Sequence, residues 1–167
     1  MGEESEVIVR VVAIGAGATV ALDLWSAFLK RFFQTRSTNW GMVGRWFGHL
    51  PRGRFVHDNI ALASPVPGEL LIGWSAHYAT GIAFAALLSA ICGLDWMRHP
   101  TPVPALLVGL LTVVFPFFIM QPGMGLGVAS SKTPKPNVAR LRSLITHTVF
   151  GIGLYASALV SALLFRQ

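Results

Sequence analysis

Four long apolar stretches, separated by more polar segments, dominate the pattern of this chain. We predict membrane-crossing helices over about residues 7–29, 70–94, 103–120 and 141–165. The second stretch contains no acidic residue, lysine or arginine over about 25 residues, which is long enough to cross the roughly 30 Å hydrocarbon core of a bilayer as a helix. The predicted fold is therefore all-α, an integral membrane four-helix bundle that forms a single membrane domain over residues 1–167.

The connection between the first two stretches contains an amphipathic segment of its own. Trp40, Val43 and Phe47 fall on one side of a short predicted helix, and Pro51 is expected to end it. Tryptophan and arginine favour the membrane interface because each joins an apolar body to a polar tip. We therefore expect an interfacial helix between the first and second spans.

Pro116 interrupts the third apolar stretch. Proline lacks a backbone N–H and its ring clashes with the preceding helical turn, so a kink is expected there. Such a kink is tolerated inside a membrane when neighbouring groups satisfy the freed carbonyl.

The composition supports a membrane protein and limits the other classes. Hydrophobic residues make up 53% of the chain and charged residues only 12%, against about 25% charged in soluble domains. Thirteen Lys and Arg against seven Asp and Glu give a net charge of +6. Because the excess lies in two inter-helix loops, we attribute it to topology and to anionic lipid headgroups and expect no nucleic acid partner. Cys92 is the single cysteine, which excludes an internal disulfide and a CxxC metal motif.

The two basic loops also predict the orientation. Loops rich in lysine and arginine stay in the cytoplasm, which places the N-terminus, the C-terminus and the LDWMRHP hairpin outside. Arg166 mildly opposes this prediction. The acidic opening MGEESE differs from the basic start of a signal peptide, so we expect the first helix to be retained.

Three ionisable residues inside the predicted spans are expected at a common depth. Asp23, His77 and His147 each lie about six to eight residues from the cytoplasmic end of their spans, or roughly 9 to 12 Å at 1.5 Å per residue. Each shares a helical face with small or polar residues, the kind of face on which membrane helices approach closely. We predict a polar pocket in the cytoplasmic half of the bundle, beneath the loop that carries His49 and His57.

The residues alone leave several interpretations of that pocket open. It is a ligand or proton site, or each histidine simply hydrogen-bonds to a neighbouring helix and Asp23 pairs with a histidine or arginine. Two histidines and a carboxylate also suit iron, zinc or manganese, and paired histidines suit haem. No local motif supports a metal, however, and no metal ligand is assigned.

Arginines around the pocket suggest an anionic ligand. Arg45, Arg54 and Arg142 would form an electrostatic collar, because guanidinium groups match phosphate and carboxylate oxygens. The alternative is a solvated cytoplasmic loop that touches lipid headgroups.

Several segments resemble a known family. They include GAGATVALDLW, GRWFGHLPRGRFVHD, PVPGELLIGWSAHYATGIAFA and PFFIMQPGMGLGVASSKTPKPNVARLRSLITHTVFGIGLY. They resemble the bacterial membrane-protein family catalogued as domain of unknown function 2938. The resemblance implies a small multi-pass protein of the bacterial inner membrane with no assigned activity. The motif residues of that family fall here on Asp23, Arg45, His49, Arg54, His57, Glu69, His77, Gln121, Arg142 and His147.

From these features we predict a protein that binds or translocates a small or anionic ligand through a cytoplasmic-side polar pocket. The candidate ligand-binding residues are Asp23, His77, His147, Arg45, Arg54, Arg142, His49, His57 and Gln121. Two other classes stay open: a metal- or His/Asp-dependent membrane enzyme acting on a lipid-like substrate, and a structural or accessory subunit. Catalytic residues and cofactor are unassigned. The expected partners are membrane lipids and, since so small a bundle needs further helices to form a pore, other copies of the chain.

Overall fold

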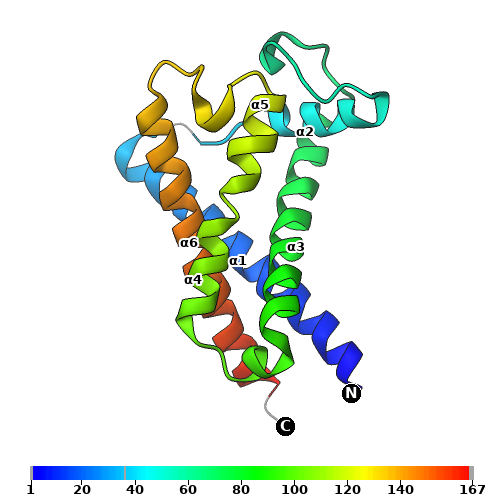
Figure 1. The fold of residues 1–167 in the computed structure, drawn as a ribbon, viewed down its shortest axis with the longest axis vertical. Coiled ribbons are helices and arrows are strands. Elements are labelled where there is room, and N and C mark those ends of the chain that lie inside the picture. Colours follow the sequence, from blue (N-terminus) through cyan, green and yellow to red (C-terminus); the bar gives the residue numbers. More distant parts are fainter. Residues whose placement is uncertain (1, 36, 166–167) are drawn as a thin grey trace. The chain divides into compact units, whose positions relative to one another are not determined.

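A computed structural model describes residues 2–35 and 37–165, and their regular structure is helical, with no strand among them (Figure 1). Four helical segments are long and apolar enough to cross a membrane: Glu3–Phe33, Glu69–Arg98, Pro102–Gly123 and Pro136–Leu164. They confirm the all-α class and the four predicted spans. Three of the four extend several residues further at one or both ends than the apolar stretches do, because charged and turn residues continue the helices.

Two spans are uninterrupted helices, α1 (Glu3–Phe33) and α6 (Pro136–Leu164). Helix α3 (Glu69–Arg98) is broken near its end at Gly93, whose φ of 75° is not helical, and the third span is composite. The third span consists of α4 (Pro102–Leu111), the π-helical turn η3 (Pro116–Met120) and α5 (Gln121–Gly123). The connections hold α2 (Trp40–His49), η1 (Leu50–Arg52), η2 (Ile60–Leu62) and η4 (Val128–Ser130).

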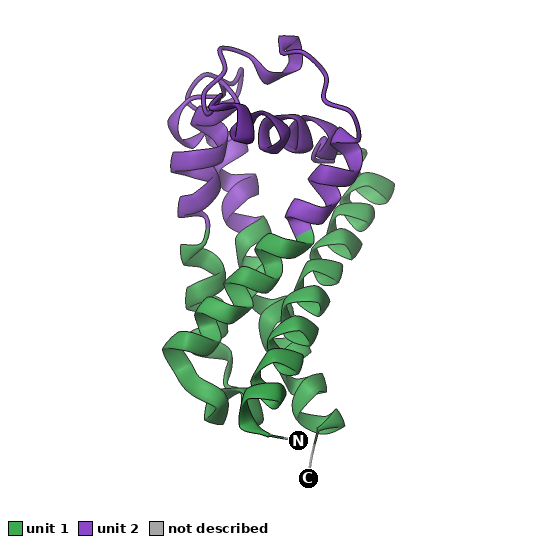
Figure 2. Ribbon diagram, turned by 90° about the vertical axis from the view of Figure 1, so that its right-hand side faces the viewer, with its two compact units in different colours: residues 1–36, 78–112, 146–167 green, residues 37–77, 113–145 purple. Residues whose placement is uncertain are grey.

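The chain divides into two compact units, shown in different colours in Figure 2. Unit 1 comprises Met1–Arg36, Tyr78–Thr112 and Thr146–Gln167, and unit 2 comprises Ser37–His77 and Val113–Ile145. Helices α1 and α4 therefore belong to unit 1, α2 and α5 to unit 2, and α3 and α6 contribute to both. Each unit is described by itself below.

Small residues bring the helices of unit 1 into close backbone contact. A Cβ atom added to Gly15 of α1 would lie 2.5 Å from the Cα atom of Ile82 in α3. A Cβ atom added to Gly109 of α4 would lie 2.4 Å from the Cα atom of Gly151 in α6. Membrane helices associate through such small-residue contacts because lipid provides no hydrophobic drive between them.

The helical hydrogen bonding of the third span changes beside Pro116, where we expected a kink. Residues 112–113 form a turn after α4, the helix resumes at residues 114–115, and a π-helical turn begins at Pro116. The N–H of Phe117 donates to the carbonyl of Val113 at 3.1 Å, so the backbone next to the proline stays hydrogen-bonded. Proline thus replaces α geometry locally without ending the span.

Unit 2 is built around the predicted amphipathic segment. The side chain of Asn39 accepts a hydrogen bond from the N–H of Met42 at 3.2 Å and starts α2. Val43 and Trp46 are buried in a cluster with Ile60 and Met124. The apolar face of α2 is therefore covered by protein within unit 2, and the helix ends at His49, just before the η1 turn that contains Pro51.

Candidate functional site

The predicted site residues are distributed over both units. Asp23 and His147 belong to unit 1. Unit 2 contains His77, Arg45, Arg54, Arg142, His49, His57 and Gln121. A single pocket shared by Asp23, His77 and His147 stays a prediction, and the surroundings of each residue are known separately.

Asp23 is half-buried in α1 and interacts with Tyr78 of α3. The phenol hydroxyl of Tyr78 donates to Oδ2 of Asp23 at 2.9 Å. A hydrogen bond to a carboxylate is about twice as strong as a neutral one. The sequence indicated an acidic group that faces protein, but it offered no sign that Tyr78 would be a partner.

His147 joins α6 to α4 within unit 1. Its Nδ1 atom lies 2.9 Å from the hydroxyl of Thr112 and 3.3 Å from the carbonyl of Gly109. The Thr112 hydroxyl itself donates to the Gly109 carbonyl at 2.6 Å, so we assign the proton on Nδ1 of His147. This is the arrangement expected for a histidine that hydrogen-bonds to a neighbouring helix.

His77 lies in a cluster of aromatic rings in unit 2. Its ring centroid is 4.0 Å from that of Trp40 in α2 and 5.8 Å from that of Trp74 in α3. The first pair of rings is tilted by 31° and the second meets edge to face at 64°, and such contacts restrict the orientation of the imidazole. Among the residues that the structure describes, no three His, Cys, Asp or Glu side chains are grouped closely enough to hold a metal ion.

Arg45 connects α2, the following loop and α3. Its Nε and Nη2 atoms donate to the two carboxylate oxygens of Glu69 at 2.8 and 2.9 Å. Its Nη1 atom donates to the carbonyls of Ile60, Ala61 and Ala63 at 3.1 to 3.3 Å. The Glu69 carboxylate raises the pKa of the Arg45 guanidinium, and all three nitrogens of that group are engaged. Arg45 therefore holds unit 2 together. Of the three arginines predicted to surround an anionic ligand, Arg54 and Arg142 remain as candidates.

His49 and His57 form a hydrogen-bonded pair. The Nδ1 atom of His49 lies 2.8 Å from Nε2 of His57, and Nδ1 of His57 lies 3.2 Å from the carbonyl of Gly123. His49 ends α2 and is only 1% exposed, whereas His57 lies in the next loop and is half-buried. Burial, His57, Arg54 and Arg52, in that order, lower the pKa of His49, and a backbone hydrogen bond with Ser64 opposes them. The pair joins the end of α2 to the loop.

The backbone of this loop is attached to the residues of α5 and just after it. The N–H of His57 donates to Gly123 at 2.9 Å, and the N–H of Ile60 donates to Met124 at 3.1 Å. Gly125 has φ +86°, and an added Cβ atom would lie 2.2 Å from the carbonyl oxygen of Asp58. Glycine is required here both for the left-handed backbone and for the close approach.

The side chain of Gln121 is buried and bonds to the second basic loop. Its Oε1 atom accepts a hydrogen bond from the hydroxyl of Ser130 at 3.0 Å, and both side chains are buried. Nearby, Nε of Arg140 donates to the carbonyl of Ala129 at 2.9 Å. These bonds order the backbone at Ala129 and Ser130, which both have positive φ.

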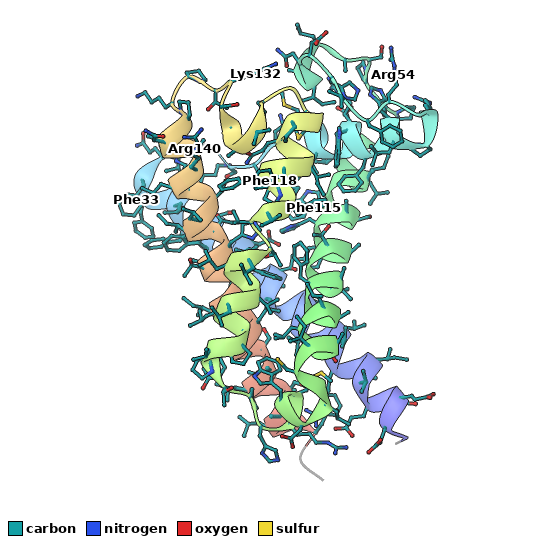
Figure 3. The ribbon with its side chains drawn as sticks, in the orientation of Figure 1. Phe33, Arg54, Phe115, Phe118, Lys132 and Arg140 are labelled. Atoms are coloured by element: carbon teal, nitrogen blue, oxygen red, sulfur yellow. The ribbon has the colours of Figure 1, made fainter. Side chains whose placement is uncertain are left out.

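The surface of unit 2 is strongly basic. The unit contains seven lysines and arginines but only two acidic residues, and one of those two, Glu69, is bound by Arg45. Its exposed basic side chains are Arg52, Arg54, Lys132, Lys135 and Arg142. Arg54 and Lys132 are labelled on the loops of the unit in Figure 3.

Apolar side chains are exposed on the same surface. Phe55, Val56 and Leu62 are 62%, 75% and 85% exposed. Together with Arg52 and Arg54 they make residues 52–62 a segment that is both basic and apolar, called the 52–62 loop from here on.

Comparison with known proteins identifies the family. The model of the family described as "Protein of unknown function (DUF2938)" matches residues 12–161. This chain belongs to the DUF2938 family. No curated protein and no solved structure matches it significantly. The match confirms the resemblance found from the motifs and covers every predicted site residue.

One charged cluster of this DUF2938 protein was not predicted from sequence. Arg10 of α1 is 2% exposed and its Nε atom donates to Glu6 at 2.8 Å. Arg98 of α3 donates to both oxygens of Glu6 at 2.5 and 3.1 Å. The remaining Arg10 nitrogens donate to the carbonyls of Met97 and Phe165 and to the hydroxyl of Ser161. The spacing of four between Glu6 and Arg10 was the available signal for the first pair.

A cavity of about 840 Å³ adjoins this cluster in unit 1 of the DUF2938 protein. Glu6, Arg10 and Arg98 line one part of it, and Leu159 and Leu163 of α6 line another. Since every nitrogen of Arg10 already has a partner, the cluster serves first to join three helix ends.

Proposed function

We propose that this protein is an integral protein of the bacterial inner membrane that binds the phosphate groups of anionic phospholipids on unit 2. The observation that carries the proposal is the excess of seven basic over two acidic residues in that unit. Four helices long and apolar enough to span a bilayer and the membership of the DUF2938 family support its place in the membrane.

The available basic groups suit a phosphate-bearing surface. Arg45 is engaged by Glu69, but five other lysines and arginines of unit 2 are exposed, and no ion pair engages them within the described part of the chain. Each basic residue near an anionic membrane surface contributes about 1 kcal/mol. Several together therefore give a preference for anionic over zwitterionic lipid that is large enough to measure.

The expected orientation supports the same ligand. Basic connections remain on the cytoplasmic side, which would place the loops of unit 2 beside the cytoplasmic leaflet. Anionic phosphatidylglycerol-type headgroups give that leaflet a negative surface potential. The exposed Phe55, Val56 and Leu62 would add apolar contact with the interface, worth roughly 25 cal/mol for each Å² removed from water.

Native mass spectrometry of the purified full chain in detergent tests the proposal. We expect more retained phosphatidylglycerol than phosphatidylcholine, and a loss of that preference in the variant Arg52→Gln/Arg54→Gln/Lys132→Gln/Lys135→Gln. The matched variant Arg52→Lys/Arg54→Lys keeps the charges and should keep the preference.

Two results would overturn this function. One is equal retention of anionic and zwitterionic lipid by the wild-type chain. The other is binding of inorganic phosphate with no lipid preference, which would indicate a soluble ligand at the same basic groups.

A further inference from the structure

The His49–His57 pair carries an inference about how the basic surface is controlled. The pair lies outside the four spans, in unit 2, and the 52–62 loop begins three residues after His49. His57 is itself part of that loop. A change in the pair therefore acts directly on residues that we propose to contact lipid.

The hydrogen bonds of the two rings limit how many protons the pair can bind while it stays intact. The Gly123 carbonyl only accepts, so Nδ1 of His57 carries a proton, and in the neutral ring Nε2 accepts from Nδ1 of His49. One further proton on His49 preserves this link as a charge-assisted hydrogen bond. A second further proton must go to Nε2 of His57. Two N–H groups of two cations would then face each other across 2.8 Å, and the link would break.

The surroundings of the pair work against protonation of His49 near neutral pH. His49 is 1% exposed, and its burial is the largest cause of its lowered pKa. Arg52 and Arg54 of the loop lower the same pKa. The acidic groups near the pair are Glu69 and Asp58. The Glu69 carboxylate of α3 faces His49 but is already bound by Arg45 of α2, and Asp58 follows His57 in the chain.

The sign of the pH effect follows from these shifts. Because the pKa of His49 is lower in the folded chain than the ordinary value of about 6.5, the released state binds more protons. The stability contributed by the docked pair is thus complete above about pH 6.5 and decreases as the pH falls below it.

The end of the loop is held by Arg45, which donates to the carbonyls of Ile60 and Ala61, and by the buried Ile60 side chain, whereas fewer contacts hold its middle. Backbone bonds join His57 to Gly123, Ile60 to Met124 and Arg54 to His49, and the indole N–H of Trp46 donates to Phe55 at 2.9 Å. The two imidazoles make the side-chain link from α2 to His57 and from His57 to Gly123. Losing that link would leave the exposed Phe55 and Val56 held by backbone bonds and by the Trp46 indole.

We propose that the His49–His57 pair is a proton-binding latch, which holds the 52–62 loop on α2 and α5 until both imidazoles are charged and then releases it. Its consequence for lipid rests on the proposed function: release would let the apolar and basic side chains of the loop reach further into the headgroups at acidic pH. The latch itself needs no lipid.

Hydrogen–deuterium exchange of the full chain in lipid-free detergent tests the latch. After correction for intrinsic rates, we expect exchange in residues 53–60 to be severalfold faster at pH 5.5 than at pH 7.5, because the lowered pKa of His49 makes the released state the better proton acceptor. In the His57→Gln variant the corrected rates at the two pH values should be equal. The control His99→Gln, in unit 1, should keep the wild-type response.

A second measurement keeps the proposal falsifiable if the variant does not fold. NMR of the ring nitrogens in the wild-type chain should show the hydrogen bond between Nδ1 of His49 and Nε2 of His57 at pH 7.5 and its loss at pH 5.5. Persistence of that bond at pH 5.5, or equal corrected exchange of the wild-type loop at both pH values, would overturn the latch. A normal loop response together with no preference for anionic lipid at pH 7.5 would instead overturn only the proposed function.

Discussion

At the scale of single residues, the polar groups that lie deep in the helices are mostly paired across helices rather than with their sequence neighbours. Asp23 is bonded to Tyr78 and His147 to Thr112, each from another helix. Periodicity correctly indicated that Asp23 and His147 face protein. It did not reveal the partners, because a contact between helices depends on rotation and depth that a single sequence does not specify.

Arg10 is the residue whose loss should matter most for stability. We expect Arg10→Met to lower the free energy of unfolding by about 3 to 5 kcal/mol, because Glu6 and three other hydrogen-bonding groups would lose a buried partner. Arg98→Gln is the matched control. The Arg98 side chain is 42% exposed, and such pairs contribute at most about 1 kcal/mol. Denaturant titration in detergent micelles measures both, and equal effects would contradict the structure.

The Asp23–Tyr78 bond can be measured by a double-mutant cycle. With Asp23→Asn, Tyr78→Phe and the double variant, we expect a coupling energy of about 1.5 to 3 kcal/mol, the range for a hydrogen bond to a charged group. Tyr155→Phe, the other tyrosine, should show no coupling to Asp23→Asn. Additive effects of Asp23→Asn and Tyr78→Phe would show that this hydrogen bond contributes nothing to folding.

At the scale of elements, the spans were predictable and their contacts were not. Apolar length located all four helices, and Pro116 located the change to π geometry. The segment 40–49 was predicted as a helix from its apolar side. Its close packing on the first turns of α3 could not be predicted, since the responsible glycines, Gly44 and Gly73, are equally compatible with a loop.

Substitution of Gly44 is the most direct test of the contact between α2 and α3. A Cβ atom there would lie 1.7 Å from the carbonyl oxygen of Glu69, and no rotamer change can move a backbone atom away. We therefore expect Gly44→Ala to separate α2 from α3, to disturb the Arg45–Glu69 pair and to destabilise by about 1 to 3 kcal/mol or more.

Gly41→Ala in the same helix is the control for Gly44→Ala. Its new methyl group would lie 3.2 Å from the Asn39 side chain, which can move, and 3.6 Å from the Glu69 side chain, an ordinary van der Waals contact. It should be neutral or slightly stabilising, because alanine favours a helix over glycine by up to about 1 kcal/mol. Thermal unfolding in detergent compares the two, and equal melting temperatures would refute the packing of α2 on α3.

At the scale of the whole molecule, charge is unequally distributed between the two units. Unit 2 has a net charge of +5, from seven basic and two acidic residues. The sequence already showed the two basic loops, and the structure assigns the second loop and residues 37–69 of the first to one compact unit. The Glu6–Arg10–Arg98 cluster was missed because its members are separated by up to 92 residues, and only folding brings them together.

Labelling of single cysteines checks the predicted orientation. On a Cys92→Ser background, we expect Glu3→Cys to react with a membrane-impermeant maleimide in spheroplasts. Lys132→Cys should react only after lysis, since the basic loops are expected in the cytoplasm. The reverse pattern would place unit 2 outside and remove it from the cytoplasmic leaflet.

The bonds of Arg10 also set an order of events during biosynthesis. Glu6 neutralises the Arg10 guanidinium as soon as the first turns form. The Phe165 carbonyl, which accepts another hydrogen bond from Arg10, lies 155 residues further along the chain. At translation rates of about 5 to 20 residues per second, synthesis of those residues takes roughly 8 to 31 s, and the nascent first span waits that long for the acceptor. During this interval the insertion machinery or water must solvate the unfilled donors. The last helix would then complete folding by supplying the remaining hydrogen-bond acceptors of Arg10, a charge that entered the bilayer with the first span.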